Sequence, residues 1–208
     1  MPSRNILKDY SEDTFYHVYN RGVNKRQIFI DNQDYSVFLS LLKRYLSKED
    51  EIDKKGRVYV SLYEELDLIS FCLMPNHFHL FLFQNSKDAI TKLLRSVCGS
   101  YTIYFNKKYE RIGPLFQSRY KASTITNDAY FMHISRYIHI NPKDYTSWEW
   151  SSLPYYLGSK QASWVKPGVV MDMFKDGEDY LEFLGQYIDY AKEMKNFEAN
   201  LAHYNTED

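Results

Sequence analysis

The sequence feature that most constrains the fold is an apolar run at residues 73–83 that carries two histidines. As a β-strand this run alternates faces with a period of two, so His77 and His79 share one face. The residues that face the other way are all apolar: Phe78, Leu80 and Leu82. Because apolar side chains occupy both faces, the run predicts a central strand that is covered on each side by other elements.

Two imidazoles at neighbouring positions on one strand face can hold a single divalent ion. The alternative is an accidental His-x-His pair, since short motifs often match by chance. Two further features support the first interpretation. The stiff, donor-less Pro75 lies just ahead of the histidines, and a second motif, Tyr137 to Pro142, follows about sixty residues later.

The second motif ends a predicted helix at residues 129–140, which Asn127 and Asp128 cap and Pro142 stops. Tyr137 and Asn141 are four residues apart, so they share the side of this helix that we expect to face the sheet. On the opposite side, Arg136 and His139 are expected to be solvated.

If this helix packs across the histidine strand, its inward side chains form a chemical site. The hydroxyl of Tyr137 is placed to attack a phosphate, and the carbonyl of Asn141 is placed to complete a metal shell. The alternative is structural, because most of the 20 tyrosines must be packing residues and an asparagine before proline is an ordinary helix end.

His17 lies in another predicted strand, residues 14–21, on the same face as Tyr19. It is either a third metal ligand or a packed, hydrogen-bonded core residue. Arg21, at the end of this strand, is better placed to meet a phosphate.

Length and composition limit what such a site belongs to. A chain of 208 residues that is 44% hydrophobic can bury a substantial core as one domain, or as one domain with an appendage. The two cysteines, Cys72 and Cys98, lie in apolar surroundings and no leading segment resembles a signal peptide, which favours a cytoplasmic location. No window approaches a membrane span, so no membrane partner is expected.

The net charge of −1 hides two oppositely charged segments. Residues 87–121 carry eight basic and two acidic side chains, whereas residues 172–208 carry three basic and ten acidic ones. The basic segment is either a solvated helix face or a nucleic-acid surface. The candidate DNA contacts are Arg21, Lys107, Lys108, Arg111, Arg119, Lys121 and Arg136.

The predicted elements alternate between strands and helices. Strands are expected at residues 14–21, 66–73, 77–83 and 120–125, and helices at about 35–47, 87–108 and 129–140. This order suggests an α+β domain, ferredoxin-like in outline, whose antiparallel sheet is flanked by helices. We assign residues 1–158 to this domain and residues 159–208 to an acidic C-terminal helical extension, with apolar residues at helical spacing from Tyr180 to Ala191.

The motifs together resemble the single-tyrosine HUH transposases, and most closely the REP-associated tyrosine transposase branch. The resemblance covers about residues 15–158 and rests on four segments in the right order: Met74 to His79, Gly113 to Arg119, Tyr137 to Pro142, and Trp150 to Ser152. It implies that His77 and His79 bind Mg²⁺ or Mn²⁺, that Tyr137 is the nucleophile, and that Asn141 occupies the position of an amide ligand.

The resemblance also implies a reaction. A single-stranded or hairpin DNA would be cleaved and rejoined through a 5′-phosphotyrosine intermediate. Two alternatives remain: a non-catalytic hairpin-binding descendant, and a metal hydrolase that uses water as its nucleophile. Whether the protein is a monomer or a homodimer is left open by the sequence.

Overall fold

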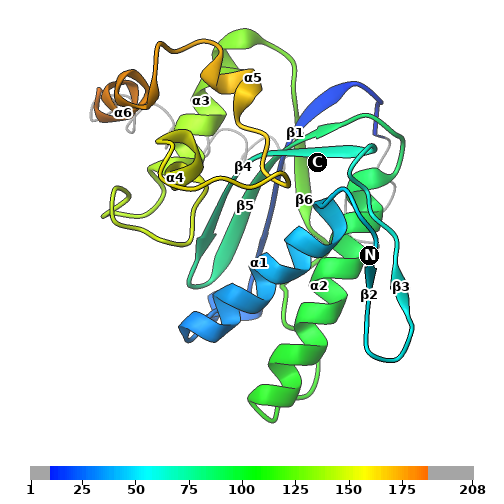
Figure 1. The fold of residues 1–208 in the computed structure, drawn as a ribbon. Coiled ribbons are helices and arrows are strands. Elements are labelled where there is room, and N and C mark those ends of the chain that lie inside the picture. The colour runs from blue at the N-terminus through cyan, green and yellow to red at the C-terminus, as the bar shows by residue number, and fades with distance from the viewer. Residues whose placement is uncertain (1–9, 187–208) are drawn as a thin grey trace, which may run out of the picture.

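A four-stranded antiparallel sheet forms the centre of the computed structural model, which describes residues 10–186 (Figure 1). Its strands are β1 (Thr14–Arg21), β4 (Leu66–Met74), β5 (His77–Gln84) and β6 (Lys121–Ile125), in the order β4-β5-β1-β6. Two interleaved strand-helix-strand units produce this order, which is the ferredoxin-like arrangement. The α+β class predicted from the sequence is confirmed.

Helices cover both faces of this sheet (Figure 1). One face is covered by α1 (Asn32–Leu46) and α2 (Ala89–Lys108), and the other by α3 (Asp128–His139). Three short helices lie beside α3: α4 (Leu153–Tyr156), α5 (Gly168–Met171) and α6 (Gly177–Gly185). A 3₁₀ turn, η1 (Val23–Lys25), and a small hairpin of β2 (Glu51–Ile52) and β3 (Val58–Tyr59) complete the described elements.

The alternation along β5 divides the core in two. Phe78 and Leu80 are fully buried against the α1 and α2 side, while Phe81 is fully buried with α3. Each face of the strand therefore has its own apolar layer, as expected for a central strand. The two histidines lie at the open end of the α3 side, where β5 begins.

The first residues of α1 and α2 are fixed by local backbone and side-chain interactions. The α1 helix has a capping box, in which the Asp31 side chain accepts a hydrogen bond from the Asp34 backbone and the Asp34 side chain accepts one from the Asp31 backbone. The α2 helix begins at Ala89, two residues later than predicted, because Asp88 adopts a left-handed conformation with φ of 68°.

The segment after residue 158 packs on the sheet domain. Trp164 stacks on Phe71 of β4, with ring centroids 5.8 Å apart. Tyr180 of α6 is buried in the apolar cluster that also contains the inward side chains of α3. The predicted helical residues at positions 187–191 lie outside the described part of the chain. None of the helices within residues 10–186 combines the length and the apolar character needed to cross a lipid bilayer.

Candidate active site

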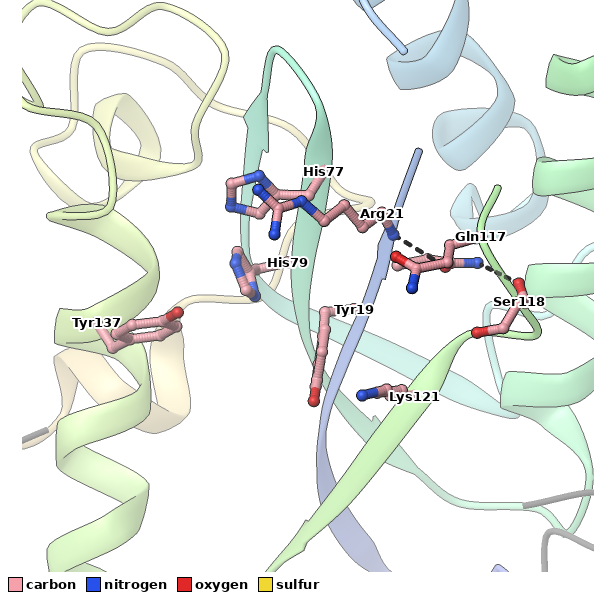
Figure 2. A pocket seen from close by; sticks show the side chains of 9 residues that line it. Tyr19, Arg21, His77, His79, Gln117, Ser118, Lys121 and Tyr137 are labelled. Carbon is pink, nitrogen blue, oxygen red and sulfur yellow. Dashed lines mark hydrogen bonds between the residues drawn. The ribbon is translucent and has the colours of Figure 1, made fainter. Parts of the chain in front are cut away.

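A cavity of about 320 Å³ opens between the end of the sheet and helix α3. Figure 2 shows His77 and His79 on β5, with Tyr137 reaching toward them from α3. The complete lining is Tyr19, Asn20, Arg21, His77, His79, Gln117, Ser118, Lys121 and Tyr137. Five residues predicted from the sequence therefore meet here: the two histidines, the tyrosine, Arg21 and Lys121.

The turn between β4 and β5 sets the orientation of His77. Asn76 Nδ2 donates a hydrogen bond to the Lys25 carbonyl (3.2 Å), which turns Asn76 Oδ1 toward His77 Nδ1 at 2.6 Å. Since Oδ1 only accepts, His77 Nδ1 carries the proton and Nε2 keeps a free lone pair. The Asn141 side chain, predicted as the third ligand, is close enough to His77 to affect the pKa of that imidazole, but it does not line the cavity.

His79 is oriented by a residue on the neighbouring strand. It is 5% exposed, and its Nδ1 lies 2.9 Å from Nε2 of His17 on β1. The Nε2 atom of His79 is buried without a hydrogen-bond partner among the described residues. Of the two possibilities left open for His17, the structure gives the hydrogen-bonded core residue.

Burial keeps all three imidazoles neutral near pH 7. It lowers the pKa of His77 to about 4, assisted by the positive charge of Arg21 and opposed by the Asn141 side chain, which favours the protonated imidazole. Burial lowers the pKa of His17 to about 3 and holds that of His79 well below its usual range. Neutral imidazoles have the lone pairs that metal coordination requires.

The donor set fits a divalent cation. Two imidazoles line the cavity with the Asn141 amide near one of them, and the buried, unpartnered Nε2 of His79 is a polar atom that a bound ion would satisfy. Within residues 10–186, no three side chains drawn from His, Cys, Asp and Glu form a closed metal cage. The set carries no negative charge, so the anionic charge around an ion would come from a phosphate.

Tyr137 contacts the histidines directly. Its ring meets that of His79 edge to face, with centroids 5.3 Å apart, and meets that of His17 at 5.9 Å. Tyr101 of α2 is fully buried and donates its hydroxyl to the Ile28 carbonyl. Tyr137 is thus the α3 tyrosine whose side chain lies in the cavity with the histidines.

The basic residues expected to contact DNA separate into two groups. Arg21 and Lys121 line the cavity, and Arg119 lines a neighbouring cavity of about 470 Å³ that shares Asn20 and Ser118 with the first. The other candidates line neither of these two cavities: Lys107, Lys108, Arg111 and Arg136.

The expectation that Arg136 and His139 are solvated is wrong. Arg136 is 7% exposed with its guanidinium 3.5 Å from the ring centroid of Phe183, and His139 is fully buried. His139 is held by the Tyr180 hydroxyl (2.7 Å) and by Ser152 Oγ (2.6 Å). The reason is tertiary: α6 and α4 cover the side of α3 that helical periodicity alone assigns to solvent.

Lys108 is engaged within the protein. Its ammonium lies 2.7 Å from an oxygen of Asp31 and 2.8 Å from one of Asp34, whose carboxylate is fully buried. These carboxylates and two tyrosine hydroxyls raise the pKa of Lys108 against the effect of burial. This cluster ties the C-terminal end of α2 to the start of α1, which is a structural role.

Four residues of the site were missed or left without a role in the sequence analysis. Asn20 belongs to no motif, and Gln117 and Ser118 lie in the segment from Gly113 to Arg119 but were given no role of their own. The hydrogen bond from Gln117 N to the Arg21 carbonyl (2.8 Å) brings that loop to the cavity. Tyr19 shared a face with His17, and this alternation was the available signal for it.

A family model described as "Transposase IS200 like" matches residues 11–141. The chain belongs to the IS200-like transposase family. This agrees with the resemblance found in the sequence, and members of the family are typically enzymes that cleave and join DNA.

One solved structure shares the fold of this IS200-like transposase at low sequence identity. A REP-associated tyrosine transposase bound to a REP hairpin is similar over 75% of this chain and 86% of its own, with 16% identity and a TM-score of 0.54. A candidate transposase from Deinococcus radiodurans R1 matches 64% of this chain and 93% of its own, with 17% identity and a TM-score of 0.40. No curated protein matches the sequence.

Proposed function

We propose that this protein is a metal-dependent single-stranded DNA endonuclease and strand transferase that uses Tyr137 as its nucleophile. The observation that carries the proposal is the meeting of Tyr137 with His77 and His79 in one cavity that is also lined by Arg21 and Lys121. Nucleophile, metal-binding groups and phosphate-binding cations are the parts that transfer of a phosphodiester requires. Membership of the IS200-like family supports the same reaction class.

In the proposed cleavage, the Tyr137 oxygen attacks the scissile phosphorus. A bond forms between that oxygen and phosphorus, the bond from phosphorus to the 3′ oxygen breaks, and the released 3′ oxygen takes up a proton while the phenol loses one. The product is a 5′-phosphotyrosine and a free 3′-hydroxyl. Attack by a 3′-hydroxyl of another strand reverses the step, so joining needs no external energy source.

The remaining groups have distinct tasks. His77, His79 and Asn141 would hold Mg²⁺ or Mn²⁺, which when bound polarises and orients the phosphate. Arg21 and Lys121 would fix the neighbouring phosphates, and the half-buried ring of Tyr19 offers a surface on which a base can stack.

The proposed substrate is a single strand that carries a hairpin. The similar REP-associated transposase binds a REP hairpin, and its fold is shared over three quarters of this chain. The basic cavity and its location at an open end of the sheet are compatible with an unpaired strand entering beside a folded hairpin.

The test is to incubate the protein with a labelled single-stranded hairpin and Mn²⁺ and to map any covalent adduct by peptide mass spectrometry. We expect an adduct on Tyr137 that is absent from Tyr137→Phe. Tyr130→Phe is the matched control, since Tyr130 lies on the same helix but does not line the cavity.

Each other outcome contradicts the proposal. An adduct on another tyrosine overturns the nucleophile assignment. Cleavage by the wild type without any adduct favours a hydrolase that uses water, and hairpin binding without cleavage favours a non-catalytic DNA-binding protein.

A further inference from the structure

His17 lies directly behind the candidate metal site. It is 7% exposed, is absent from the cavity lining, and lies close to the rings of Tyr19 and Tyr137, with centroids 5.1 Å and 5.9 Å away. Its Nε2 atom is 2.9 Å from Nδ1 of His79. His17 is therefore placed to act on His79 and not on a ligand in the cavity.

The hydrogen bond between the two imidazoles is well directed. Their planes are 22° apart and their centroids 5.0 Å apart, which is about the separation of two rings that meet edge to edge through one hydrogen bond. The nitrogen lone pair lies in the ring plane, so the nearly coplanar arrangement aims it at the other nitrogen. The two imidazoles share one proton, and its position decides whether Nε2 of His79 has a lone pair or an N–H.

The surroundings of His79 select one of the two positions. If the shared proton were on His17 Nε2, then His79 Nδ1 would accept it and neutral His79 would carry its N–H at Nε2. That N–H would be a buried donor without a partner among the described residues. If the proton is on His79 Nδ1, then Nε2 keeps a lone pair. Asn76 selects the same tautomer in His77, because its Oδ1 accepts a hydrogen bond from Nδ1 of that imidazole at 2.6 Å.

We propose that His17 is a positioning residue that holds His79 in the Nδ1–H tautomer and so presents Nε2 of His79 to the divalent ion. This inference rests on the proposed function for the presence of the ion. Hydrogen-bond partners of metal-bound histidines fix both the tautomer and the ring orientation, and their loss commonly weakens metal binding 10- to 100-fold.

Three substitutions of His17 separate positioning from packing. His17→Gln places an amide oxygen near the position of the imidazole Nε2, whereas the amide of His17→Asn ends near Nδ1 and His17→Leu has no acceptor. We measure Mn²⁺ affinity by electron paramagnetic resonance, with and without a single-stranded oligonucleotide, in the Tyr137→Phe background so that no DNA is cleaved. We expect His17→Gln to stay within about threefold of the parent and the other two to bind about 10- to 100-fold more weakly.

The Gln and Asn variants are a matched pair, because both introduce a buried amide and either alone would disturb packing. Equal Mn²⁺ affinity in His17→Asn and the parent overturns the proposal, even if His17→Leu fails to fold. Oligonucleotide binding in the presence of EDTA reports folding, and we expect it to be unchanged in the Gln and Asn variants.

A second measurement needs no metal. Long-range ¹H–¹⁵N correlation spectra of the histidine side chains in the metal-free protein report the tautomer of His79. We expect the Nδ1–H form in the wild type and in His17→Gln, and loss of that form in His17→Asn; an Nε2–H form in the wild type overturns the proposal. If the wild type binds no Mn²⁺ but shows the expected tautomer, the failure is that of the proposed function.

Discussion

Substitution of Gly22 tests how the turn between β4 and β5, just before His77, is supported. The buried Gly22 follows β1, and a Cβ atom at its position would overlap the carbonyl oxygen of Arg26 and lie 2.8 Å from Cγ2 of Ile28. The backbone nitrogen of Gly22 donates to the Asn76 carbonyl (2.9 Å), and that of Ile28 donates to the Pro75 carbonyl (2.8 Å). The substitution Gly22→Ala must therefore displace a segment that is tied to the turn before His77.

The cost can be worked from these contacts. Overpacking against backbone costs about 1–3 kcal/mol, and each backbone hydrogen bond that lengthens adds about 1 kcal/mol. We expect Gly22→Ala to lower the free energy of unfolding by about 2–4 kcal/mol, which for a domain of this size is a fall in Tm of about 6–12 °C. At a temperature where the variant is folded, displacement of His77 should reduce adduct formation about 10- to 100-fold.

Gly99→Ala is the matched control for this experiment. Gly99 lies within α2, is exposed, and has no atom within 4 Å of a Cβ at its position. The same chemical change there should raise stability by about 0.5–1 kcal/mol, because alanine is the better helix former. Urea unfolding of both variants gives the comparison. If Gly22→Ala unfolds within 1 kcal/mol of the wild type, the tight packing of this segment against the turn is refuted.

Three further predictions follow from the charges and the buried histidines. Lys108→Met should lower the free energy of unfolding by about 1–3 kcal/mol, because the charged hydrogen bonds of Lys108 are lost. Lys107→Met, at the exposed neighbouring position, should change it by less than about 0.5 kcal/mol. Equal effects of the two substitutions in urea unfolding would contradict the structural role of Lys108. Arg21→Gln and Lys121→Gln should each reduce the slope of log affinity against log salt concentration by about 0.7 for single-stranded DNA. Fluorescence anisotropy measures this affinity. An unchanged slope would mean that the DNA binds elsewhere. Burial lowers the pKa of His139 to about 3, against about 6.5 when unfolded, so below pH 6.5 the unfolded chain binds a proton that the folded chain does not. Stability should fall as the pH drops from 6.5 to 4, and His139→Gln should reduce that slope by about 1.4 kcal/mol per pH unit; a slope unchanged from the wild type would contradict the neutral buried state.

The parts of the fold with local causes were predictable from the sequence. Alternation at residues 77–83 gave the central strand and its two faces, and helical periodicity placed Tyr137 on the side of α3 that meets the cavity. These signals depend on periods of 2 and 3.6 residues, which the backbone geometry of strands and helices imposes. The order of strands and helices was sufficient for the ferredoxin-like class.

The parts with distant causes were not predictable. The bond between His17 and His79 depends on β1 pairing with β5 at one register, in which Tyr19 is opposite His79. Arg136 and His139 are buried because α6, some forty residues later in the chain, covers them. Helical periodicity assigns a side chain to a face of its own helix and says nothing of what later packs against that face.

The location of Tyr137 on α3, with Asn141 two residues beyond the last residue of that helix, has a mechanical consequence. His77 and His79 belong instead to the central strand of the sheet. A shift of α3 relative to the sheet therefore moves the attacking oxygen, carries the amide with it and leaves the imidazoles behind. Substitutions that loosen α3 from its support should weaken cation binding and slow covalent attack in proportion, so that the two quantities fall on one line across a series of such variants.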